Sequence, residues 1–252
     1  MKRTLVILSV VLVLSGAAFI LFLEASNPCN ARTIGDIPAP FGYDRVEADK
    51  GSYPEFLRSL PLKKRGSKVM LFTGGRARLQ FLSAAVVDLP LISNDEQCAD
   101  ITMRMRAEYL WMKGRYNDLK FTGLNGKTIA YHEGDTRSSF ESWLKTVYAN
   151  CNTTSVFNET RERPLDEIQS GDILVYKTRK KGYYGHAILV ADVARGRGGK
   201  VAVLCVEGNT PAREAHIVRN PNPFRNPWHI IREGEGYQIS VFHFYKNELR
   251  HY

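Results

Sequence analysis

An uncharged apolar run lies close to the amino terminus of this chain. Nineteen residues without a charged side chain form Leu5–Leu23, and the cations Lys2 and Arg3 precede them. The apolar core of a signal peptide usually has about 7–15 residues, whereas a membrane-spanning helix needs about 20. We therefore predict that residues 1–26 are a membrane anchor or a cleaved signal peptide.

Either form of this segment implies an exported protein. The positive end of such a segment stays in the cytoplasm, so the body of the chain crosses the membrane. We expect a periplasmic or otherwise extracytoplasmic location, with the protein membrane-anchored or secreted. Residues 27–42 contain Pro28, Pro38 and Pro40 and little periodicity, which is typical of a linker. The rest, 43–252, is long enough for one well-buried domain.

Charge and cysteine content narrow the classes of partner and cofactor. The formal net charge of +9 suits an anionic partner such as a membrane face or a cell-wall polymer. The basic residues form no recognised motif with aromatic residues, so we expect no nucleic acid. The four cysteines include no C-x-x-C pair, and neither an H-E-x-x-H motif nor a nucleotide-binding loop occurs, so we expect no metal and no cofactor. The sequence leaves open whether Cys29 and Cys151 form a disulfide.

The order of the predicted elements favours an α+β fold. Helices are predicted over 53–60, from about 98 to 113 and over 138–149, the second with a capping box formed by Ser93 and Glu96. Two early strands are predicted over 68–73 and 84–89, with a Gly74-Gly75 turn after the first. Four more, over 171–176, 185–191, 200–207 and 237–244, make the last third rich in strands. Helices followed by a mostly antiparallel sheet are typical of the α+β class.

Cys98 is the candidate nucleophile. It lies in the first turn of its predicted helix, where unpaired backbone N–H groups and the positive end of the helix dipole favour a thiolate. Cys205 is a rival, but the apolar residues 201–206 around it predict a buried position in the middle of a strand.

His186 is the candidate base, and its orienting group is left open between two residues. His186 begins a predicted strand beside an open loop. Glu207 and Asn209 share one face of the next strand, separated by Gly208, and either could hold the imidazole. His216 is a second candidate partner for the base.

These residues together resemble the papain-like cell-wall hydrolases of the NlpC/P60 and CHAP superfamily. The resemblance rests on Gln97-Cys98-Ala99-Asp100, on residues 171–176, on Gly185-His186-Ala187 and on Glu207-Gly208-Asn209. It implies a papain-like α+β domain with elaborations, in which a helix bearing the cysteine packs on a mostly antiparallel sheet bearing the histidine. It also implies that Cys98 is the nucleophile, His186 the base, and Glu207 and Asn209 the orienting groups.

A second resemblance covers nearly the whole chain from Ile37 onward. Residues 37–43, 97–100 and 104–110 are similar to an uncharacterised family of exported bacterial proteins, known as a domain of unknown function.

The resulting hypothesis is an exported cysteine amidohydrolase or peptidase that forms a thioester. The first resemblance and the compartment together imply a substrate in peptidoglycan or a related amide, carried by a cell-wall polymer or by an exported protein or peptide. The alternative is a non-catalytic binding module of the cell envelope on a degenerate papain-like fold.

Overall fold

The computed structural model describes residues 30–132, 134, 136–180, 184–222, 227–234 and 236–252. The predicted anchor or signal peptide lies outside these residues. Within them, the structure contains no helix with the length and apolar character needed to cross a membrane.

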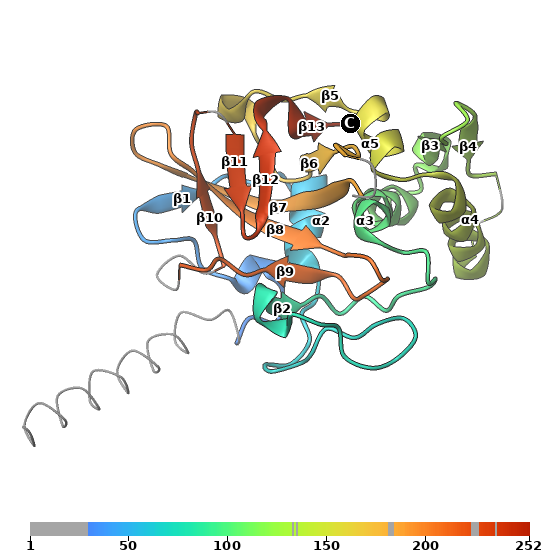
Figure 1. The fold of residues 1–252 in the computed structure, drawn as a ribbon, viewed down its shortest axis with the longest axis horizontal. Coiled ribbons are helices and arrows are strands. Elements are labelled where there is room, and N and C mark those ends of the chain that lie inside the picture. Colours follow the sequence, from blue (N-terminus) through green and yellow to red (C-terminus); the bar gives the residue numbers. More distant parts are fainter. Residues whose placement is uncertain (1–29, 133, 135, 181–183, 223–226, 235) are drawn as a thin grey trace, which may run out of the picture.

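A nine-stranded antiparallel sheet forms the centre of the molecule (Figure 1). Its path runs β2-β9-β8-β7-β6-β13-β5, while β1 pairs with β7 and β10 pairs with β8. The bounds are β1 Tyr43–Arg45, β2 Ser83–Val86, β5 Arg161–Glu162, β6 Ile173–Tyr176, β7 His186–Gly196, β8 Val201–Glu207, β9 His216–Val218, β10 His229–Ile231 and β13 Leu249–His251.

Helices and two small hairpins surround this sheet. The helices are α2 Tyr53–Ser59, α3 Cys98–Met112, α4 Arg137–Asn150 and α5 Thr153–Glu159, and the hairpins are β3 Lys120–Thr122 with β4 Thr128–Ala130 and β11 Gly236–Ile239 with β12 Phe242–Tyr245. Short 3-10 helices occupy Ile34–Asp36, Gln80–Leu82, Tyr116–Asp118, Leu165–Glu167 and Lys246–Glu248. The α+β class predicted from the sequence is confirmed.

Both faces of the sheet are buried, which explains why β7 and β8 are almost continuously apolar. Side chains on one face, such as Leu189 and Leu204, join the core under α2 and α3. Side chains on the other face, such as Val190 and Val203, pack under the β11–β12 hairpin (Figure 1). The sheet is therefore the middle layer, and its strand ends can bring groups from both outer layers together.

The helix that begins at Cys98 starts later than its predicted capping box. The Glu96 carboxylate accepts the Ile92 N–H at 2.8 Å and pairs with Arg104, so it is not available to cap Ser93. The first turn is instead closed by Asp100, whose Oδ2 accepts the N–H of Gln97 at 2.9 Å. Cys98 thereby becomes the first residue of α3.

Two predicted strands are wrong. Over 68–73 the chain forms only isolated bridges, because the Gln80 side chain bonds both the N–H and the C=O of Val69 in place of a neighbouring strand. The strand predicted over 237–244 is the β11–β12 hairpin, since the chain reverses at Ser240, whose φ is 51°.

The predicted linker also differs, because its described part is packed against the domain. Ile34 and Ile37 are buried, and Thr33 forms a bridge with Pro61. The remaining predicted helices and the strands at 84–89, 171–176, 185–191 and 200–207 are confirmed to within a few residues, although β7 continues to Gly196.

Candidate active site

Cys98, His186 and Glu207 lie together where the start of α3 meets the ends of β7 and β8. All three side chains are buried. Cys98 opens the helix, His186 is the first residue of β7 and Glu207 is the last residue of β8. Cys98 and His186 share a hydrogen bond, although they are 88 positions apart in the sequence.

The His186 imidazole connects the thiol to a carboxylate. Its Nε2 lies 2.8 Å from Oε2 of Glu207 and donates to it, because a carboxylate can only accept. Burial alone lowers the pKa of His186, but the hydrogen bonds with Cys98 and Glu207 outweigh burial and raise this pKa to about 9. The carboxylate therefore fixes the ring and favours its protonated form.

The carboxylate of Glu207 contacts two histidines. Its second oxygen, Oε1, lies 3.3 Å from Nε2 of His216, the residue paired with Glu207 between β8 and β9. The other ring nitrogen of His216 faces the carbonyl oxygen of Glu214 at 3.0 Å. Burial raises the pKa of Glu207, but the hydrogen bonds from His186 and His216 outweigh burial and lower it to about 2. Glu207 is thus held as a carboxylate.

Asn209, the other predicted orienting residue, does not contact the imidazole. Strand β8 ends at Glu207, so the alternation of side chains no longer applies two residues later. The Asn209 side chain turns to the backbone and accepts the N–H of Thr210 at 2.8 Å. Of the two alternatives left open by the sequence, Glu207 is the one that holds His186. His216 is not a direct partner of His186, because it contacts the other oxygen of Glu207.

Phe242 covers His186, a contact that the sequence patterns did not predict. Its ring stacks on His186 with the ring centroids 3.9 Å apart and the planes at 20°. Phe242 belongs to the β11–β12 hairpin, which was predicted as a single strand. The contact shields one face of the imidazole from water and leaves Cys98 on another side of the ring.

The remaining candidate cysteine, Cys205, does not contribute to this group of side chains. Cys205 is buried in β8 as expected, and burial raises its pKa well above the usual range of a thiol. Cys29 lies outside the described residues.

A cavity of about 180 Å³ opens beside Cys98. It is lined by Asp95, Gln97, Cys98, Ala99, Asp100, Tyr148, Cys151, Asn152, Thr153, Thr178, Tyr184, Gly185 and Thr210. Burial raises the pKa of Asp100 in this lining to about 8. In the described part of the chain, no group of three His, Cys, Asp or Glu side chains is arranged to hold a metal ion.

Gly208 allows the helix to approach the strand end. A Cβ at this position would lie 2.6 Å from Cγ1 of Ile101 and 3.0 Å from the carbonyl oxygen of Gln97. The neighbour of Gly208 is therefore the first turn of α3. Any side chain here pushes against the turn that carries Cys98.

We expect Gly208→Ala to destabilise the protein by about 1–3 kcal/mol, the usual effect of overpacking. The same change should slow alkylation of Cys98, because the start of α3 must move. Urea denaturation and iodoacetamide labelling measure the two effects. The matched control is Gly234→Ala, where an added Cβ meets no atom closer than 3.9 Å. Equal stability of the two variants would contradict the close packing described here.

Comparison with known proteins assigns this chain to a family but not to an activity. The sequence profile of the family described as "Domain of unknown function (4846)" matches residues 35–134 and 132–251. No curated protein and no solved structure matches the chain.

Proposed function

The chain belongs to the family of the domain of unknown function 4846, and we propose that its activity is that of a cysteine amidohydrolase or peptidase. One observation carries this proposal: the buried His186 bonds Cys98 on one side and the Glu207 carboxylate on the other. A nucleophile within reach of a base, with a third group orienting that base, is the arrangement that covalent catalysis requires.

The proposed reaction begins at Cys98. Its sulfur attacks the carbonyl carbon of an amide, and His186 accepts the thiol proton. His186 then donates this proton to the leaving amine as the C–N bond breaks, which leaves a thioester. A water molecule next gives a proton to His186 and adds to the thioester carbon. The C–S bond breaks, the acid is released and the thiol regains its proton.

Backbone groups at the start of α3 supply the expected oxyanion site. The first N–H groups of a helix have no acceptor within that helix, and Cys98 is the first residue of α3. Donors in this position can stabilise the negative charge that develops on the carbonyl oxygen during attack. The Gln97 side chain adjoins this turn, and its Oε1 accepts the Thr210 hydroxyl at 2.6 Å.

The arrangement also supports a papain-like fold as part of the proposal. A helix bears the cysteine at its first residue, and an antiparallel sheet carries the histidine and its carboxylate on β7 and β8. Between α3 and the sheet strands in sequence come β3, β4 and α4, which lie beside α3 on its side away from the central sheet (Figure 1). They account for the long separation between Cys98 and His186.

The proposed substrate is an amide of peptidoglycan or of an exported peptide. The uncharged run at Leu5–Leu23 and the net charge of +9 favour an extracytoplasmic site of action on an anionic polymer. The cavity beside Cys98 has the acidic residue Asp95 in its lining. A substrate with a nearby amino group would match it.

Digestion of purified peptidoglycan by the full chain in detergent tests the proposal. We expect new peptide fragments by mass spectrometry from the wild type and none from Cys98→Ala or His186→Ala. Cys205→Ala and His132→Ala are the matched controls, because Cys205 is buried within β8 and His132 is exposed. Both should produce the same fragments as the wild type.

Two outcomes would count against the hydrolase. Fragments that persist in Cys98→Ala would assign the reaction to another group. An absence of fragments from every folded form, together with a Cys98 thiol that resists iodoacetamide, would favour the envelope binding module.

A further inference from the structure

A second surface, formed by residues outside the Cys98–His186–Glu207 set, has the chemistry of a membrane contact. The segment 63–82 contains six cations and no acidic residue: Lys63, Lys64, Arg65, Lys68, Arg76 and Arg78. All of these except Lys63 are exposed. The Lys63 ammonium is paired with Glu214 at 2.6 Å. Within the described residues, no ion pair involves Lys64, Lys68, Arg76 or Arg78.

Large apolar side chains are interspersed among these cations. Phe72, Leu79 and Phe81 are 44%, 57% and 66% exposed. Single exposed apolar residues are ordinary, but three in one short basic segment are the combination found at membrane surfaces. These three apolar side chains would enter the boundary between lipid headgroups and acyl chains, while the cations bind lipid phosphates.

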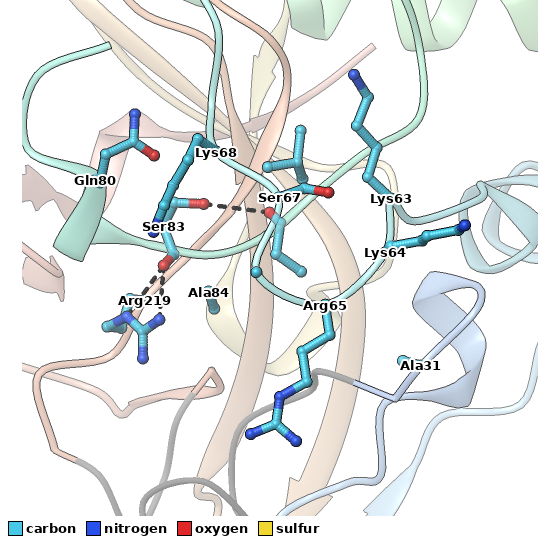
Figure 2. A pocket seen from close by; sticks show the side chains of 13 residues that line it. Ala31, Lys63, Lys64, Arg65, Ser67, Lys68, Gln80, Ser83, Ala84 and Arg219 are labelled. Atoms are coloured by element: carbon cyan, nitrogen blue, oxygen red, sulfur yellow. Dashed lines mark hydrogen bonds between the residues drawn. The ribbon is translucent and has the colours of Figure 1, made fainter. Parts of the chain in front are cut away.

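The segment also borders a cavity of about 290 Å³. Figure 2 shows Lys63, Lys64 and Arg65 on one side of it, and Lys68, Ser83 and Arg219 on the other. Lys63, Lys64 and Arg65 fan outward from their backbone instead of meeting at one point (Figure 2). This geometry suits a broad anionic surface better than a single enclosed anion.

The position of this cavity connects it to the amino-terminal segment. Ala31 lies in the cavity lining, so the chain enters the described domain beside the basic segment. Only seven residues, 24–30, separate Ala31 from the uncharged run that ends at Leu23. Seven residues reach at most about 25 Å. If Leu5–Leu23 stays in the bilayer, this side of the domain is kept close to the lipid headgroups.

We propose that the segment 63–82 docks on the surface of an anionic phospholipid bilayer, next to the anchored amino terminus. This docking would hold the domain in one orientation on the membrane. It does not require that Cys98 be catalytic, because none of the docking residues is part of the Cys98–His186–Glu207 set.

Hydrogen exchange of the full chain in lipid nanodiscs tests the docking. We compare discs of phosphatidylcholine alone with discs that contain phosphatidylglycerol. Amides in 63–82 should exchange more slowly in the anionic discs, and 0.5 M salt should remove the difference by screening. Each cation near an anionic bilayer contributes about fivefold to the docking equilibrium. Neutralising Lys64, Lys68, Arg76 and Arg78 together to Gln should therefore weaken docking by roughly 100-fold or more.

The matched control neutralises four exposed cations elsewhere, Lys120, Lys127, Lys145 and Arg161. This variant and Cys98→Ala should both dock like the wild type, which separates docking from the proposed hydrolase. Equal exchange in the two kinds of disc, or an equal loss of docking in the control, would overturn the proposal. Protection that requires added peptidoglycan instead of anionic lipid would identify a cell-wall contact and overturn it as well.

Discussion

Replacing Glu207 with Gln should reduce kcat by about 10²- to 10⁴-fold on any amide that the wild type cleaves, as expected when the orienting carboxylate of a catalytic histidine is lost. The neutral amide keeps the size of the side chain but cannot stabilise the charge on His186. It can also present its NH₂ group to the ring, which would favour the wrong tautomer. Turnover of the full chain on peptidoglycan measures the effect.

The titration of His186 separates positioning from simple loss of structure. The hydrogen bond and charge of Glu207 help to raise the pKa of His186 to about 9, so this pKa should fall in Glu207→Gln. Histidine ring signals followed by NMR against pH report it. Glu248→Gln is the control, because Glu248 is another buried carboxylate that pairs with Arg179 instead of a histidine. A Glu207→Gln variant with wild-type turnover and an unchanged His186 titration would remove Glu207 from the site.

The same pair gives stability a defined pH dependence. The pKa of His186 is raised from 6.5 to about 9, so its contribution is complete below pH 6.5 and is lost as pH rises through 9. The pKa of Glu207 is lowered from 4.5 to about 2, so its contribution is present above pH 4.5 and is lost as pH falls through 2. The stability difference between the wild type and Glu207→Gln should be largest between pH 4.5 and 6.5.

Local sequence patterns were sufficient to predict where the three site residues lie in their helix and strands. Cys98 near a helix start, His186 at a strand start and Glu207 near a strand end follow from helical periodicity and strand alternation, although the predicted capping box does not form. The α+β class follows because helical and strand periodicities occupy different parts of the chain. The bond from His186 to Glu207 needed the fold, since both Glu207 and Asn209 satisfied the alternation.

The contacts that the sequence did not predict depend on which segments pair in the folded chain. Phe242 reaches His186 because the chain reverses at Ser240 and forms a hairpin over the sheet. His216 reaches Glu207 through the register of β9 on β8. The apolar segment at 68–73 is not a strand because Gln80 satisfies the backbone of Val69. None of these pairings is encoded in a window of neighbouring residues.

The largest effect on folding is expected from Asp192, a fully buried carboxylate in β7, the strand that carries His186. Its Oδ1 accepts from Nη2 of Arg58 at 2.7 Å, and its Oδ2 lies 2.8 Å from Nε of Arg45 without the alignment of a hydrogen bond. Arg45 is in β1 and Arg58 is in α2. Asp192 thus ties the first described elements of the domain to the central sheet.

We expect Asp192→Ala to lower the free energy of unfolding by about 3–5 kcal/mol, because it leaves two partly buried cations without their carboxylate. Urea denaturation measures the loss. The matched control is Asp118→Ala, which removes a carboxylate paired with Arg115 at the surface and should cost only about 0–1 kcal/mol. The difference between the two variants isolates the effect of burial on the ion pair.

Asp192→Asn distinguishes charge from hydrogen bonding at this position. The amide retains an oxygen that can accept from Arg58 and from the N–H of Val193, which lies 2.9 Å from Oδ1 in the wild type. If the negative charge is the main contribution, Asn should be nearly as destabilising as Ala.

If Asp192→Ala costs no more than Asp118→Ala, Arg45 and Arg58 must be stabilised by their backbone acceptors. Those acceptors include the carbonyl of Gly35 for Arg45 and that of Val46 for Arg58. The tie between the first elements and β7 would then rest on these neutral hydrogen bonds instead of on the ion pairs.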